Sequence, residues 1–283
     1  MTALSKSIYN TCQANKDGSK ATQNERLTCL LHFARTVHSW GQKPQSVRGI
    51  KDKHTNRFFK EISHLDAGTR KNYAWHLRWL EGKTNKRGLI PKSNEDLGIP
   101  SRTANGENIA KKLDTAKLQN VTCDHAKMSI RLMAAFGLRR KESIMIRPVQ
   151  ADKGDKIALQ ASWTKGKVAR EIPITTERQR ALLNEAKKLA GNGALIPDGK
   201  DFYQQENTVD HQCRTKLNNG RKHAYRHNYA QWRYQCLTGW KCPKAGGKTK
   251  LTKSEKRCDR WARNVLTREM GHFDLYKTKV YIG

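Results

Sequence analysis

Hydrophobic residues recur at helical intervals in the N-terminal part of the chain. Thr22 and Glu25 have the spacing of an N-terminal capping box, and the apolar stripe that follows them predicts a helix to about Trp40. Two further stripes, over residues 58–62 and 73–80, predict two more short helices with basic flanks. Short basic helices in succession are typical of a small helical DNA-binding domain.

The boundaries of this first domain follow from the loss of periodicity on either side. Residues 1–20 are polar, and we expect them to have no fixed structure. Gly and Pro interrupt a basic stretch from residue 83 to residue 110, which we interpret as a linker able to lie along DNA. We therefore predict a helical domain over residues 1–82, and we expect Trp75 and Trp79 to fill its core rather than to stack on bases.

A second domain, residues 111–283, has a different pattern. An apolar helical stripe over residues 128–136 ends at a glycine. Alternation over residues 157–163 and again over 170–174, with a TKGK turn between them, predicts a β-hairpin. A further amphipathic helix follows over residues 176–191. The predicted fold class is therefore mainly α with one small β-sheet.

The net charge of the chain indicates which kind of partner it binds. Among 283 residues, 56 are Lys or Arg and 25 are Asp or Glu, which gives a formal net charge of +31. Such a chain repels itself, and a polyanion relieves the repulsion by releasing its condensed counterions. No run of apolar residues is long enough for a membrane span or a signal peptide. Nucleic acid is thus the expected partner, and a ribosomal or chromatin-type protein is the plain alternative.

The cysteines add no metal site to the prediction. Seven is an odd number, no CxxC pair occurs, and we expect reduced thiols in a cytoplasmic protein. Three of them near a histidine suggest a zinc site as a minor alternative, but their spacing fits no standard zinc module. These three are Cys236, Cys242 and Cys258.

The second domain contains four clusters that suit the cleavage of a phosphodiester without a metal. This reaction needs arginines to neutralise the phosphorane, an acid for the departing oxygen and a nucleophile to hold the cut end. The clusters are Gly137-Leu138-Arg139 with Glu142, Thr164-Lys165-Gly166 with Arg170 and Pro173, His223-Ala224-Tyr225-Arg226 followed by His227, and Gly271-His272 with Tyr281 nine residues later.

Together these clusters resemble the motifs of the tyrosine recombinases, which include phage-type integrases and Xer-type resolvases. All four occur in the order and with the internal spacing of that family, over about 170 residues. The resemblance implies an N-terminal core-binding (SAM-like) helical domain followed by an α+β catalytic domain. Tyr276 is a rival for the nucleophile, but it follows His272 five residues too early for the family spacing.

The resemblance also implies a role for each motif residue. Arg139 and Arg226 would clamp the scissile phosphate, while His223 and His272 complete the hydrogen-bond set. Lys165 would be the general acid, and Tyr281 would form a 3′-phosphotyrosyl bond. The remaining two residues have other expected roles: Glu142 orients Arg139, and His227 serves packing.

The family also implies how the protein works as a whole. Transesterification conserves the bond energy, so no cofactor or metal is expected. The expected partners are double-stranded DNA at recombination sites, three further copies of the chain in a tetramer on DNA, and possible accessory DNA-bending or directionality proteins. The expected source is a bacterium or phage, often a mobile genetic element, and the expected location is the cytoplasm, on the nucleoid.

The chain departs from the family pattern in two places. Arg226 and His272 are 46 residues apart, roughly twice the expected gap, and the excess lies around residues 239–260. This segment is predicted to be either an extra basic loop or helix that touches DNA, or a disordered surface insertion. Only Ile282 and Gly283 follow Tyr281, so we expect little to tether the nucleophile. A truncated chain would also explain this end.

Two other functions share parts of the pattern. A type IB topoisomerase-like enzyme would use the same chemistry on one duplex, without a specific site. A non-catalytic DNA-binding relative would keep the basic charge but lose a phosphate ligand or the tyrosine. Every motif residue is present in this sequence, which favours the recombinase.

Overall fold

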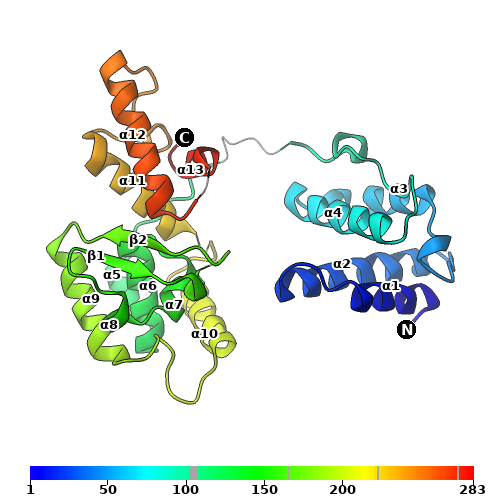
Figure 1. The fold of residues 1–283 in the computed structure, drawn as a ribbon, viewed down its shortest axis with the longest axis horizontal. Helices are drawn as coiled ribbons and strands as arrows, with labels where there is room; N and C mark the ends of the chain where they lie inside the picture. Colours follow the sequence, from blue (N-terminus) through cyan, green and yellow to red (C-terminus); the bar gives the residue numbers. More distant parts are fainter. Residues whose placement is uncertain (102–106, 165, 222, 273) are drawn as a thin grey trace. The chain divides into compact units, whose positions relative to one another are not determined.

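The chain folds into two compact units, Met1–Thr103 and Ala104–Gly283, in a computed structural model (Figure 1). The structure describes residues 1–101, 107–164, 166–221, 223–272 and 274–283. Among these residues no helix is both long and apolar enough to cross a membrane. The predicted fold class, mainly α with a small β-sheet, is confirmed.

The first unit is built from α-helices joined by short 3₁₀ turns. The α-helices are α1 (Ala3–Ala14), α2 (Lys20–Ser39), α3 (Asp52–Glu61) and α4 (Ala67–Lys83), and the turns are η1 (Val47–Gly49), η2 (Ile62–His64) and η3 (Glu95–Leu97). The prediction that residues 1–20 have no fixed structure was wrong. The Thr2 side chain caps α1, and Leu4 and Ile8 are buried in the core, so two well-spaced apolar residues suffice to dock a polar helix.

Most of the expected linker belongs to this first unit. Leu89, Ile90, Leu97 and Ile99 are at most 7 % exposed and pack in the same core as α2 and α4. The Arg78 guanidinium donates to the carbonyl of Pro91 at 2.8 Å, which satisfies backbone in a segment without regular structure. The stretch from residue 83 is thus a packed part of the first unit rather than a free connection.

The two tryptophans of α4 have different surroundings. Trp75 is 52 % exposed, so the expectation that it fills the core was wrong. Trp79 is half-buried, and the buried guanidinium of Arg26 lies 3.9 Å above its ring. The indole nitrogen of Trp79 also donates to Asp17 at 2.9 Å. Trp79 therefore ties α4 to α2 and to the turn before it.

The second unit surrounds one small sheet with helices (Figure 1). Strands β1 (Lys156–Leu159) and β2 (Arg170–Pro173) pair antiparallel with Ile157 opposite Ile172, which confirms the predicted hairpin. The first strand is shorter than expected, because residues 161–163 form the 3₁₀ turn η4. The helices are α5 (Thr115–Leu118), α6 (Asp124–Phe136), α7 (Arg140–Met145), α8 (Pro148–Ala151), α9 (Glu177–Ala190), α10 (Phe202–Thr215), α11 (Ala224–Thr238), α12 (Lys253–Glu269) and α13 (Leu275–Ile282), with the 3₁₀ turn η5 (Pro243–Ala245).

Helix α6 is the centre of this unit and packs against α7, α9, α10 and α11. Met128 and Leu132 face the core shared with the hairpin and α12, while Ile130 and Met133 face a second core shared with α10. Gly137 ends α6 with a φ of +61°, and a Cβ there would lie 2.4 Å from the ring of Tyr229 on α11. This close approach brings the start of α7 to the start of α11.

Candidate active site

Arg139 lies at the N-cap of α7, held by the acidic residue one turn further on. Its backbone nitrogen donates to Glu142 Oε2 at 2.6 Å and its Nη1 donates to Glu142 Oε1 at 2.7 Å. The Nη2 donates to the carbonyls of Met270 and Gly271, at 3.2 and 3.3 Å. The side chain is 18 % exposed. Arg139 thus joins α7 to the end of α12 and still has surface open to a ligand.

Arg226, in the first turn of α11, is buried beside Arg139. Its two terminal nitrogens donate to the carbonyls of Gly137 and Met270, so both arginines share the Met270 oxygen. Its Nη2 lies 3.5 Å from His272 Nε2. Burial lowers the pKa of Arg226 to about 10, which leaves it charged at neutral pH. Two guanidinium groups at one backbone turn form a centre of positive charge suited to an anion.

The hydroxyl of Tyr281 lies at this centre. Arg226 Nε is 3.4 Å from the Tyr281 oxygen, and the guanidinium carbon is 5.7 Å from the ring centroid. The ring is flanked by two imidazoles, with centroid distances of 4.3 Å to His227 and 5.3 Å to His272. The rival Tyr276 is 58 % exposed. Of the two tyrosines on α13, the structure brings Tyr281 to the arginines.

Both imidazoles next to Tyr281 are neutral at pH 7. Burial lowers the pKa of His227 to about 4, helped by the charges of Lys244, His223 and Arg226. Burial, with the charges of Arg226 and Arg139, lowers the pKa of His272 to about 3. His227 was expected to serve packing rather than catalysis, and its ring packs on the Tyr281 ring.

The sequence reasoning missed the role of Arg170, on β2. Its Nη1 and Nη2 donate to the two oxygens of Glu142 at 2.8 and 2.6 Å, and its Nε donates to the Glu269 carbonyl at 2.9 Å. A Cβ on Gly271 would lie 2.8 Å from Arg170 Cδ, so the chain needs glycine there to run over this side chain. The available signal was the alternation of Arg170 with Ile172 and Ile174, which places the arginine on the apolar face of the strand, where a charge requires a partner.

The Glu142 carboxylate interacts with the charges of three arginines, Arg139, Arg170 and Arg226. Burial alone would raise the pKa of its carboxyl, but the hydrogen bonds and charge of Arg170, with the charges of Arg226 and Arg139, lower that pKa to about 2. The carboxylate is fully buried and ionised. It accepts hydrogen bonds from the backbone and side chain of Arg139, and it also neutralises Arg170.

The two remaining expected site residues are His223 and Lys165. His223 is the N-cap residue of α11, one turn before His227, and is exposed. Lys165 lies outside the described residues. A groove of about 510 Å³ lies between the hairpin and α12, and its lining includes Val168, Arg170, Arg268 and His272. The groove therefore borders the cluster at Arg170 and His272.

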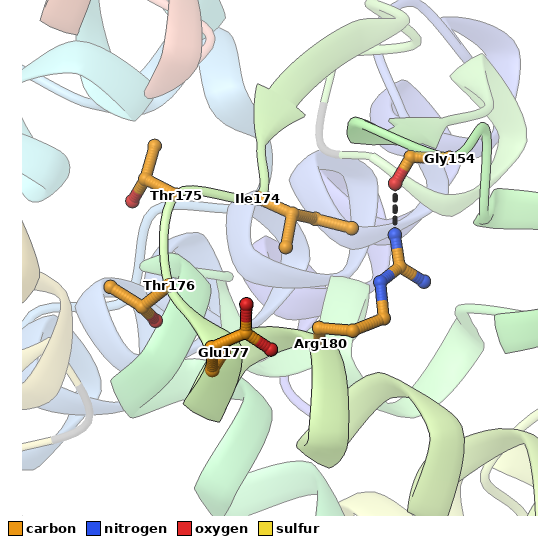
Figure 2. A pocket seen from close by; sticks show the side chains of 6 residues that line it. All are labelled: Gly154, Ile174, Thr175, Thr176, Glu177 and Arg180. Carbon is orange, nitrogen blue, oxygen red and sulfur yellow. Dashed lines mark hydrogen bonds between the residues drawn. The ribbon is translucent and has the colours of Figure 1, made fainter.

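A second hollow, of about 320 Å³, lies at the start of α9 and includes none of the expected site residues. Figure 2 shows its lining: Gly154, Ile174, Thr175, Thr176, Glu177 and Arg180. The Arg180 guanidinium donates to the Gly154 carbonyl across it. This hollow lies between the end of the hairpin and the start of α9.

The cysteines do not assemble into a metal site. All seven are free thiols. Within the described residues, no group of three or more His, Cys, Asp or Glu side chains is arranged to hold a metal ion.

Solved structures share this fold, although no family model and no curated protein matches the chain. The XerH site-specific recombinase bound to palindromic difH substrate, in a post-cleavage complex, matches with a TM-score of 0.58 and 16 % identity over 99 % of this chain and 81 % of that one. Its pre-cleavage complex with difH matches with a TM-score of 0.56 and 17 % identity, over 99 % and 80 %.

A third structure is similar over nearly its whole length. The integrase of the Tn1549 transposon, in complex with transposon right end DNA, has a TM-score of 0.55 and 13 % identity, over 100 % of this chain and 95 % of that one. Identities this low establish architecture rather than activity. The chain has the tyrosine recombinase fold.

Proposed function

We propose that this protein is a site-specific DNA recombinase that cuts and rejoins DNA through a 3′-phosphotyrosyl bond on Tyr281. The observation that carries the proposal is the position of the Tyr281 hydroxyl, 3.4 Å from Nε of the buried Arg226. A phosphate bound by Arg226 and Arg139 would meet this hydroxyl directly. The fold shared with DNA-bound recombinases and the net charge of +31 support the same function.

The proposed reaction needs no cofactor, because one phosphodiester replaces another. The Tyr281 oxygen attacks the scissile phosphorus, the bond from phosphorus to the 5′-oxygen breaks, and the 3′-phosphate stays on the tyrosine. Arg139 and Arg226 offset the charge that develops on the phosphorane oxygens, and His223 and His272 complete the hydrogen bonds. Attack by a 5′-hydroxyl from a partner duplex reverses the step and restores Tyr281.

Two protons move in this step. Lys165 is proposed to donate one to the departing 5′-oxygen, as the family resemblance implies. The proton of the Tyr281 hydroxyl leaves as the new bond forms. The pKa of His272 is about 3 without DNA, which makes its neutral imidazole a weak base. The negative charge of a phosphate bound beside it would raise that pKa, and the imidazole could then accept the proton.

The proposed substrate is double-stranded DNA bearing a recombination site, gripped by both units of the chain. Four protomers on two sites would complete the exchange. Because phosphate contacts release counterions, binding should weaken steeply as salt rises.

A suicide DNA substrate, which traps the covalent intermediate, tests the nucleophile. The wild-type chain should form a covalent adduct, Tyr281→Phe should form none, and Tyr276→Phe on the same helix should behave as wild type. An adduct that persists in Tyr281→Phe would refute the assignment. Relaxation of supercoiled plasmid without any specific site would instead favour the topoisomerase-like alternative.

The role of Lys165 has its own test. Lys165→Met should slow cleavage by about 10²–10⁴-fold, the usual contribution of a general acid. A substrate with sulfur in place of the bridging 5′-oxygen needs no such acid, so it should restore most of the rate. Equal loss on both substrates would remove Lys165 from this role.

A further inference from the structure

The stretch between α11 and α12, residues 239–252, packs against the helix that carries Tyr281. Cys242 is fully buried in the same core as Ile282, and the turn η5 contacts α13. α13 lies beside α11 and α12 as well (Figure 1). Residues 242–245 of the excess segment are therefore packed, and residues 253–260 belong to α12, so the disordered insertion considered from the sequence was wrong.

Two side chains reach the carbonyls of the last turn of α13. Lys244 Nζ, in η5, donates to the Val280 carbonyl at 2.8 Å. Gln231 Nε2, on α11, donates to the Tyr281 carbonyl at 3.1 Å. The last four carbonyls of a helix have no partner within it, so these donors supply what the helix itself lacks.

Asn108 connects these two donors. Its Oδ1 accepts a hydrogen bond from Gln231 Nε2 at 2.8 Å, and its Nδ2 donates to the backbone carbonyl of Lys244 at 2.8 Å. Gln231 is 9 % exposed, so its amide group is held on two sides in a nearly dry setting. One amide side chain thus fixes both the direction of Gln231 and the distance of η5 from α11.

The peptide units on both sides of the Tyr281 Cα are held by this arrangement. The Val280 carbonyl belongs to the peptide unit that precedes Tyr281, and the Tyr281 carbonyl belongs to the one that follows it. With both anchored, the rotations of the tyrosine side chain are the main freedom left to its hydroxyl. The helix α13 has eight residues, too few to be stable alone in water, so its place depends on such contacts.

We propose that Gln231 and Lys244, aligned by Asn108, are positioning residues that hold the nucleophile at the arginine pair. This inference rests on the proposed function, because it assigns the role of these residues in the attack by Tyr281. Neither side chain needs to touch DNA for this role. A small displacement of an attacking atom lowers a reaction rate sharply while leaving substrate affinity unchanged.

Isosteric variants test the proposal. Gln231→Met and Lys244→Met remove the donors and keep side-chain length, Lys244→Arg keeps a donor, and Lys241→Met removes the same charge from a neighbouring exposed lysine. The measurements are the single-turnover rate of covalent adduct formation at saturating suicide substrate and the Kd for the same DNA. Amide hydrogen exchange over α13 in the free protein is the third readout.

Gln231→Met and Lys244→Met should each form adduct roughly ten-fold more slowly, with Kd within about two-fold of wild type. Lys244→Arg should keep most of the rate, and Lys241→Met all of it. Exchange over α13 should quicken in the two slow variants and not in the control. Wild-type adduct rates in both methionine variants, or losses explained by Kd alone, would overturn the proposal.

The two proposals fail in different ways. If the wild-type chain forms no adduct, the recombinase function fails. The exchange of α13 then still tests the anchoring, and unchanged protection in Gln231→Met would overturn that too. If the wild-type adduct forms and the methionine variants match it, only the positioning role is lost.

Discussion

Arg170 donates through both terminal nitrogens to the carboxylate of Glu142, at 2.8 and 2.6 Å, and the two side chains are 4 % and 0 % exposed. The pair joins strand β2 to helix α7. Because Glu142 Oε1 also accepts a hydrogen bond from Arg139, one buried carboxylate aligns Arg139 and neutralises the buried Arg170. Glu142 therefore contributes both to the stability of the fold and to the geometry of the site.

Removing the charge of Glu142 should destabilise the second unit strongly. Glu142→Gln leaves Arg170 buried without a counter-charge, and breaking a buried pair in this way costs about 3–5 kcal/mol. Glu171→Gln is the matched control, because Glu171 forms an exposed pair with Lys156 on the same hairpin and such pairs contribute about 0–1 kcal/mol. Urea denaturation of both variants measures the difference. Equal losses in the two would contradict the assignment.

The same carboxylate should make stability depend on pH in the acid range. Its pKa is about 2 in the folded chain, against an ordinary value of 4.5, so the unfolded chain binds the proton more readily. Stability from this group is complete above pH 5 and is lost as pH falls toward 2, roughly 3 kcal/mol in all. Urea midpoints between pH 7 and 3 should fall less for Glu142→Gln than for the wild-type chain.

His227 should add a second, separate acid dependence. Its pKa falls from 6.5 to about 4 on folding, mainly through burial, so stability drops as pH decreases from about 6.5 to 4. Its Nδ1 is buried and makes no hydrogen bond within the described part of the chain. His227→Phe keeps an aromatic ring against Tyr281 and removes the titration. Melting temperatures at pH 7.5 and 4.5 should therefore differ less in this variant, and an unchanged difference would argue against the shift.

Gly137 should tolerate no side chain, whereas Gly239 should. Both end a helix with positive φ, +61° and +85°, so alanine costs about 1–2 kcal/mol at either from the backbone alone. At Gly137 the new Cβ would also lie 2.4 Å from a Tyr229 ring atom, while at Gly239 nothing lies within 4 Å. Overpacking adds about 1–3 kcal/mol. Denaturation of Gly137→Ala beside Gly239→Ala measures this clash, and similar losses would show that Tyr229 moves aside freely.

The role of Arg170 should depend on the geometry of its paired donors as well as on its charge. Arg170→Lys retains one positive charge beside Glu142 and loses the paired donors and the bond to the Glu269 carbonyl. We expect a slower covalent step at unchanged DNA affinity, because the chain at Gly271, next to His272, runs over this side chain. Adduct formation and Kd measured together check this. A wild-type rate would mean that the charge alone suffices.

Local spacing in the sequence predicted several features that are set by neighbours along the chain, but not all of them: helix α1 was missed, and the N-cap of α2 is Ser19 rather than Thr22. The capping pair Arg139 and Glu142 is three residues apart, so one helical turn brings them together wherever α7 lies. The hairpin follows from alternating apolar residues, and the choice of Tyr281 over Tyr276 follows from its distance along the chain from His272. Periodicity and spacing report such contacts because they depend on backbone geometry alone.

Contacts between residues that are far apart in the sequence were determined by packing. Arg170 meets Glu142 across 28 residues, Arg226 meets the Gly137 carbonyl across 89, and Gln231 reaches the Tyr281 carbonyl across 50. The same is true of residues 83–101, whose few apolar side chains show no local pattern and are ordered by a core shared with α2 and α4. In residues 1–20 the helical spacing of Leu4 and Ile8 is too short a signal by itself, and the same core orders this helix. A sequence records which charges and donors are present. Only the burial of helices against one another determines which of them are left without water and must be paired.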